Sequence, residues 1–139
     1  MILTDWKRAK TVNLPDYGQV GAGKIVEFVP RGKQRINVPN SQRTEGLVTV
    51  SVCGDSLRDL GINDGDNLVC QTKFEKSEVK NGKLVVAQLP CLGLVVKFFF
   101  QFENKIILRS ANPRYEDLIY DADLVEIKAL VIQSVKNWD

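Results

Sequence analysis

The chain has 139 residues, of which 44% are hydrophobic and 26% are charged, and it contains no histidine. This length is enough to bury one hydrophobic core but is short for two domains. The absence of histidine excludes a Ser-His-Asp triad, a Cys-His dyad and the His-Glu-x-x-His class of zinc hydrolases. We therefore expect one domain that uses no metal and no cofactor.

The net charge of +2 is unevenly distributed along the chain. Residues 1–43 carry eight Lys and Arg against three Asp and Glu, whereas residues 44–139 carry eleven against fourteen. The longest apolar run, residues 92–100, is far shorter than the ~20 residues of a membrane span, and the N-terminus lacks the apolar stretch of a secretory signal. We expect a cytoplasmic protein without membrane contact.

Residues 1–43 are predicted to form an extended N-terminal arm. They hold three of the five prolines and two glycine-containing turns, "DYGQVGAG" and "PRGKQ". Proline and glycine interrupt regular elements and favour turns. We therefore separate an arm or linker at residues 1–43 from a folded body at residues 44–139.

The body shows the alternating, β-branched runs that are typical of strands. In chain order they are "LVTVSVC", "NLVCQT", "KLVVAQL", "LGLVVKFFF", "NKIILRS" and "LVEIKALVIQSV". Short connections such as "NDGDN" and "KNG" favour hairpins, and no helical stripe is sustained over ~11 residues. The sequence predicts an all-β fold, mostly a curled antiparallel sheet.

Cys53, Cys70 and Cys91 lie in or beside these runs without a Cys-x-x-Cys pair, so we expect reduced core thiols and no zinc site.

Ser56 follows the first of these runs, in "VCGDSLRDLG". Gly54 allows a sharp bend there, which leaves backbone N–H groups free to face a ligand. In one interpretation Asp55 and Ser56 only cap a short turn. In the other, Ser56 is a nucleophile and the N–H groups around Gly54 to Ser56 stabilise an oxyanion.

Lys97 interrupts the most apolar run, "LVVKFFF". On an alternating strand its side chain could simply point outward. If it points inward, burial favours the neutral amine and lowers its pKa, which would give a general base in a chain without histidine. A serine paired with a neutral lysine is a known combination of nucleophile and base.

Five segments together resemble the self-cleaving peptidase domain shared by LexA, UmuD and lambda-type phage repressors. They are "VCGDSLRDLGINDGDNLV", "NGKLVVAQL", "GLVVKFF", "KIILRSANPRYEDL" and "VEIKALVIQSVKNWD". The resemblance implies a β fold like that of LexA and signal peptidase, with Ser56 as the nucleophile and Lys97 as its base. Leu57 stands where the family usually has methionine, and Phe98 where it usually has a basic residue.

The resemblance also implies self-cleavage between a small residue and a glycine upstream of the serine. The segment "GQVGAGKIVEF" offers the bond between Ala22 and Gly23, although Gly-Ala-Gly is also an ordinary flexible turn. Residues 24–46, at roughly 3.3 Å per extended residue, are long enough to return this bond to the serine of the same chain.

Three functions are compatible with this resemblance. The Ala-Gly bond favours the peptidase domain of a LexA-like or prophage-type repressor in the SOS DNA-damage response, with cleavage stimulated by RecA on single-stranded DNA. The length and the initial Met1 favour a UmuD-like accessory subunit of a translesion DNA polymerase. The third is a dimerisation or interaction module that does not cleave.

The segment before Gly23 is too short for a helix-turn-helix domain, so we expect no direct DNA binding by this chain. We also expect a homodimer formed through "LVEIKALVIQSVK".

Overall fold

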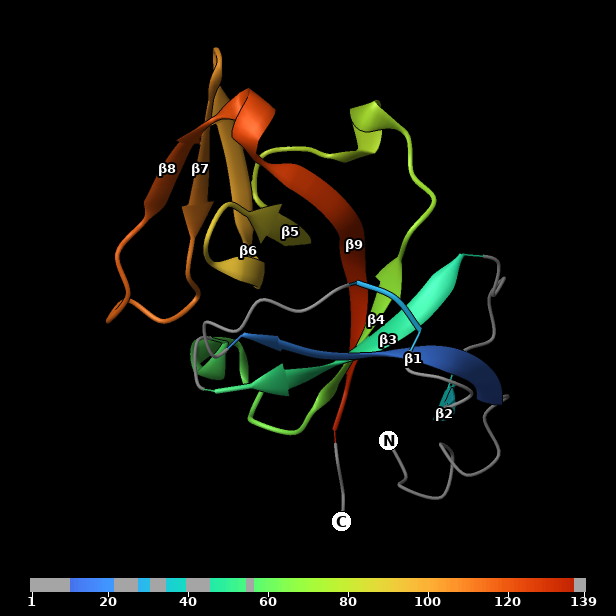
Figure 1. Cartoon of the computed structure of the whole chain (residues 1–139). Coiled ribbons are helices and arrows are strands. Elements are labelled where there is room, and N and C mark those ends of the chain that lie inside the picture. Colours follow the sequence, from blue (N-terminus) through green and yellow to red (C-terminus); the bar gives the residue numbers. More distant parts are fainter. Residues whose placement is uncertain (1–10, 22–27, 31–34, 40–45, 55–56, 137–139) are drawn as a thin grey trace.

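The computed structural model describes residues 11–21, 28–30, 35–39, 46–54 and 57–136. These residues form a curled nine-stranded sheet in the order β2-β1-β3-β4-β9-β5-β6-β7-β8 (Figure 1). The strands are β1 (Thr11–Gly21), β2 (Arg35–Pro39), β3 (Leu47–Cys53), β4 (Asn67–Gln71), β5 (Lys83–Leu89), β6 (Gly93–Phe102), β7 (Lys105–Arg109), β8 (Leu118–Asp121) and β9 (Glu126–Val135). The described residues contain no α-helix, only the short 3-10 turns η1 (Arg58–Leu60), η2 (Lys76–Glu78) and η3 (Ala122–Leu124). The prediction of a mostly antiparallel all-β fold is confirmed.

Strand β9 joins the two halves of the sheet. Its first half, from Glu126 to Leu130, pairs with β5, and its second half, from Leu130 to Val135, pairs with β4. The long red ribbon in Figure 1 shows this continuity from the β5–β8 half into the β1–β4 half. Both halves are thus parts of one folded unit, because a single strand contributes backbone hydrogen bonds to each.

Strand β1 changes partners midway. Residues 11–15 pair antiparallel with β2, whereas residues 16–21 pair with β3 in the one parallel pairing of the described sheet. Pro15, which has no backbone N–H to donate, lies at this change, and Gly18 adopts a φ of +91° with its N–H bonded to Asp16 Oδ1 at 2.8 Å. Part of the predicted arm is therefore built into the sheet, while the division of the chain at residue 43 stays a prediction.

The core consists of two main clusters of apolar side chains. The first packs β3, β4, β5, β6, β9 and the residues on either side of η1, and it contains Val48, Val50, Val52, Leu57, Ile62, Leu68, Cys70, Val86, Leu94, Val96 and Ala129. The second packs β5, β6, β7 and β9, and it contains Val85, Ala87, Leu89, Phe99, Ile106, Leu108 and Leu130. Strand β6 contributes to both clusters, so both of its faces are covered. A lysine within this strand is for that reason held between two packed layers.

The cysteines are free thiols in different settings. Cys70 is fully buried in β4, Cys53 is half-buried, and Cys91 is exposed in the turn between β5 and β6. The expectation of core thiols is therefore wrong for Cys91, because this residue lies in a tight hairpin turn with a φ of +67° and not in a strand.

Across the residues that the structure describes, no helix is long and apolar enough to cross a membrane.

Candidate functional site

The sequence predicts a turn around Ser56, and the last described residue before Ser56 is Gly54. Strand β3 ends at Cys53. Gly54, which follows it, has a φ of +98°, a backbone conformation that residues other than glycine rarely adopt. The Gly54 N–H donates a hydrogen bond to Oδ1 of Asp64 at 2.8 Å. This bond fixes the near side of the turn, whereas Asp55 and Ser56 lie outside the described residues.

The far side of the turn is fixed by Leu57. Its side chain is 1% exposed and belongs to the same core cluster as Leu94 and Val96 of β6. Its carbonyl accepts hydrogen bonds from the N–H groups of Leu60 at 3.0 Å and Ile62 at 3.4 Å. The residue directly after Ser56 and the residue directly before Lys97 are thus packed in one cluster.

The loop at residues 61–66 supports this turn from the side. The Val52 N–H bonds to the Asp66 carbonyl at 2.9 Å, and the Gly65 N–H bonds to the Val52 carbonyl at 2.8 Å. The buried Asp66 carboxylate accepts from the Asn63 N–H at 2.8 Å and pairs with Lys136 Nζ at 3.1 Å. The loop that holds Gly54 is therefore tied both to β3 and to the end of β9.

Lys97 lies in the middle of β6 and is only 9% exposed. In the sheet it is opposite Val85 of β5, which is completely buried. Its Nζ lies over the ring of Tyr115, 5.9 Å from the ring centroid. The lysine is thus turned into the protein, as the second of the two sequence interpretations required.

Tyr115 is presented by a tight turn that follows β7. The Tyr115 N–H bonds to the Asn112 carbonyl at 3.1 Å, and the Arg114 N–H bonds to Asn112 Oδ1 at 3.0 Å. Asp117, two residues after Tyr115, is held by Arg109 of β7 through Nε at 3.2 Å and Nη2 at 3.0 Å. This turn brings one aromatic ring and one paired carboxylate to the neighbourhood of the lysine.

Burial is the main influence on the protonation of Lys97. Removal of the ammonium from water lowers the pKa of Lys97, and the negative charge of Asp117 opposes this by raising it. The pKa of Asp117 is itself held below its ordinary value, chiefly by its hydrogen bond to Arg109. The balance favours the neutral amine at a lower pH than for an exposed lysine, and a neutral amine can accept a proton from a hydroxyl group.

Lys97→Met is expected to stabilise the fold at neutral pH by about 1 kcal/mol, or ~3–5 °C in Tm. Because the pKa of Lys97 is lower in the folded state, the folded protein is penalised whenever this lysine is charged. The gain should be full below the folded pKa and should shrink as the pH approaches the ordinary lysine value of ~10.4. Urea unfolding at pH 7 and at pH 10 measures it, and a destabilised variant at pH 7 would contradict the unfavourable burial of the charge.

Two of the three cysteines, Cys70 and Cys91, are poorly suited to act as nucleophiles in place of the serine. Burial raises the pKa of Cys70 to about 12, so its reactive thiolate is scarce at neutral pH. Cys91 is exposed in the hairpin turn that joins the end of β5 to the start of β6. In the described part of the chain no group of three or more Cys, Asp or Glu side chains is arranged to hold a metal ion.

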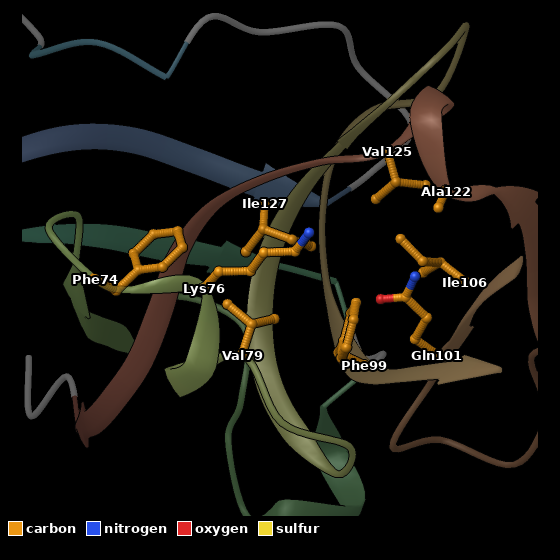
Figure 2. Close-up of a pocket in the computed structure, with 9 residues that line it drawn as sticks. All are labelled: Phe74, Lys76, Val79, Phe99, Gln101, Ile106, Ala122, Val125 and Ile127. Atoms are coloured by element: carbon orange, nitrogen blue, oxygen red, sulfur yellow. The ribbon is translucent and has the colours of Figure 1, made fainter. Parts of the chain in front are cut away.

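A cavity of about 470 Å³ lies elsewhere, between the η2 segment, the β6–β7 hairpin and β9. Figure 2 shows its largely apolar walls, with the polar ends of Lys76 and Gln101 beside them. The lining residues are Phe74, Lys76, Val79, Phe99, Gln101, Ile106, Ala122, Val125 and Ile127. Lys97 is not among the residues that line this cavity, although Phe99, two residues further along β6, is one of them.

The structure describes only some of the site residues that the sequence predicts. Gly54 and Lys97 are described, whereas Ala22, Gly23, Asp55 and Ser56 lie outside the described residues. Contacts that the sequence analysis missed are those of Asp64, Tyr115 and Asp117. Tyr115 and Asp117 lie in "RSANPRYEDL", one of the segments that carry the family resemblance. No pattern in that segment indicates that either residue lies near Lys97.

Comparison with known proteins gives one matching family. The profile of the family described as Peptidase S24-like matches residues 15–132, a range that includes Gly54, Ser56 and Lys97. This match covers most of the chain; it begins within β1 and ends within β9.

Three similar proteins are each named LexA repressor. The chain is 32% identical over 131 residues to the LexA repressor of Acidiphilium cryptum, which covers 94% of this chain and 55% of the relative. It is 30% identical to the LexA repressor of Granulibacter bethesdensis, covering 94% and 53% respectively. It is 31% identical to that of Gluconobacter oxydans, covering 93% and 53%. The chain spans about half the length of the curated relatives it matches.

Proposed function

Because the chain belongs to the Peptidase S24-like family, we propose that it is a self-cleaving serine endopeptidase with Ser56 as nucleophile and Lys97 as general base. The observation that carries the proposal is the burial of Lys97 in β6, which lowers its pKa in a chain that has no histidine. A second support is the core cluster shared by Leu57 and Val96, the chain neighbours of the two proposed catalytic residues.

The proposed reaction has two steps. Neutral Lys97 accepts the proton of the Ser56 hydroxyl as Oγ attacks the carbonyl carbon of Ala22, and the protonated lysine then donates to the departing nitrogen of Gly23. In the second step the lysine activates a water molecule, which hydrolyses the acyl-enzyme. Each step needs one group that first takes and then returns a proton, and one lysine suffices for both.

The oxyanion is assigned to backbone N–H groups of the serine turn. The Gly54 N–H is already bonded to Asp64, so its role in the proposal is to set the direction of the turn. The amides that follow, those of Asp55 and Ser56, are the proposed donors to the developing negative charge. Gly54 then acts through its positive φ and not through its own N–H.

Gly54→Ala should slow self-cleavage about 10-fold or more and should destabilise the fold by about 1 kcal/mol, because alanine rarely adopts a positive φ. Gly82→Ala is the matched control. Gly82 has a φ of +89°, close to that of Gly54, and an added Cβ at either position meets no atom within 4 Å. Fragment yield and urea unfolding of both variants check the prediction. Equal losses of cleavage in the two variants would mean that lost stability, and not the serine turn, explains the effect.

Cleavage is proposed to occur within one chain, between Ala22 and Gly23. The fraction cut per unit time should then be independent of protein concentration, because the connector holds the target at a high effective concentration. Intact mass spectrometry over a hundredfold dilution series measures this. A rate that rises in proportion to concentration would rule out the assignment in cis, and a bulky residue at Gly23 should block the cut in either case.

The biological role is proposed from the relatives. Their name, LexA repressor, favours the peptidase part of a repressor. In this role a RecA filament on single-stranded DNA would stimulate the self-cleavage in the response to DNA damage. We propose the same role, in the cytoplasm, for the protein that contains this chain. A UmuD-like accessory subunit of a translesion polymerase is the alternative, and the reading frame upstream of Met1 distinguishes the two, since a repressor encodes a DNA-binding domain there.

A homodimer is proposed through the end of β9. Val131 and residues 133–135 pair with β4 on one side, with an irregularity at Ile132, and within the described part of the sheet no strand pairs with their other side. Ile132, in the middle of this stretch, is 44% exposed. An open strand edge with an exposed apolar side chain is suited to pairing with a second copy. Sedimentation of Ile132→Lys, expected to be monomeric, tests this interface.

A further inference from the structure

The turn beside Lys97 contains a charge pair to which the catalytic proposal gives no role. Arg109 of β7 binds Asp117 through three contacts of 3.0–3.3 Å, and Asp117 lies two residues after the Tyr115 ring that covers the Lys97 ammonium. Arg109 also lies over the ring of Phe100, 5.3 Å from its centroid. Both ends of the ion pair are thus placed by neighbours of Lys97, on β6 and on the covering turn.

We propose that Arg109 and Asp117 act as positioning residues that set how readily Lys97 releases its proton, and thereby set the pH at which the chain cleaves itself. This inference rests on the proposed function only for its effect on cleavage. Asp117 supplies a carboxylate whose negative charge raises the pKa of Lys97, and Arg109 holds that carboxylate through its hydrogen bonds. Any change that frees Asp117 strengthens its attraction for the lysine proton.

The surroundings of Lys97 make this carboxylate decisive. Val85, its partner on β5, and Ser110, the residue directly after β7, are uncharged. Tyr115 contributes a ring face, and the same turn also bears the exposed side chains of Arg114 and Glu116. The titratable or charged groups from the packed elements are Lys83 of β5, Lys105 and Arg109 of β7, and Arg114, Tyr115, Glu116 and Asp117 of the turn.

The direction of each effect follows from the signs of the charges. Asp117→Asn removes a negative charge, so Lys97 should lose its proton at a lower pH and cleavage at pH 7 should become faster. Arg109→Gln removes a positive charge and frees Asp117, so the midpoint should rise and cleavage at pH 7 should become slower. Because the pair is largely exposed, we expect shifts of about 0.3–0.5 pH unit at low salt, equivalent to ~2–3-fold in rate.

The test measures Lys97 directly and separately from cleavage. Lysine side-chain NMR titration in the Ser56→Ala background gives the Lys97 midpoint for each variant, with Lys97→Arg to assign the signal. Lys105→Gln is the matched control, since Lys105 lies on the same strand, is similarly exposed and pairs with Asp121 instead. The shifts for Asp117→Asn and Arg109→Gln should be opposite in sign and should vanish near 1 M salt, where the Debye length is ~3 Å.

The outcomes separate this inference from the proposed function. Opposite shifts of the Lys97 midpoint, followed by the pH profiles of cleavage, support both. Opposite shifts in a protein that no variant or pH induces to cleave support the charge pair and overturn the proposed function. Unchanged midpoints, shifts in the same direction, or a shift as large in Lys105→Gln would overturn the charge pair even if cleavage is normal.

Discussion

Replacing Ser56 by alanine is expected to reduce self-cleavage by at least ~10³-fold while the fold remains intact. The substitution removes a single oxygen atom, and the neighbouring Leu57 side chain keeps its place in the core. Fragment yield after prolonged incubation, together with circular dichroism and urea unfolding, measures both parts of the prediction.

Ser77→Ala is the control for this experiment, because Ser77 lies exposed in η2 and has no role in the proposed reaction. It should cleave at the rate of the natural sequence. Cleavage that persists in purified Ser56→Ala would remove the nucleophile assignment. If alkylation of the folded protein then stopped the reaction, a thiol would take its place, with the half-buried Cys53 the first to examine.

Replacing Lys97 by arginine is expected to abolish the activation of cleavage at alkaline pH. The neutral fraction of Lys97 grows as the pH rises from 7 toward the ordinary lysine pKa of ~10.4. Because burial lowers the pKa of Lys97, this growth occurs at lower pH than for an exposed lysine. The rate should rise about 10-fold per pH unit below the folded pKa and should level above it. Arginine keeps its charge throughout this range and so cannot act as the base.

A pH series of fragment yield for the natural sequence and Lys97→Arg decides this point, with circular dichroism at each pH to detect unfolding. Lys83→Arg, on the neighbouring strand β5, should retain the alkaline rise. A profile with one midpoint near 6.5 is not expected, because the chain has no histidine. A flat profile, or one that survives in Lys97→Arg, would exclude the lysine as the base.

The strands of the body could be predicted because their local signals agree with their tertiary setting. The runs that became β5, β6 and β7 join in chain order through short hairpins, and such pairing follows from nearby turn residues. The parallel pairing of β1 with β3 could not be predicted. It joins segments about thirty residues apart, and Pro15 and Gly18 within β1 are signals against a strand.

The inward direction of Lys97 was one of two interpretations, and alternation could not choose between them. A strand with one solvent-facing side buries every second residue, but β6 is covered on both faces over much of its length. The contact with Tyr115 and the charge of Asp117 depend on how the turn after β7 folds back. That placement is set by tertiary packing, which the sequence pattern does not encode locally.

The most direct test of self-cleavage is a time course of intact mass at pH 7 and at pH 9–10, with and without a RecA filament on single-stranded DNA. We expect two new masses that correspond to residues 1–22 and 23–139 and together equal the intact chain plus one water. They should form faster at alkaline pH or with the filament, and they should be absent in Ser56→Ala. An unchanged mass under all of these conditions, or a cut at another bond, would contradict this expectation.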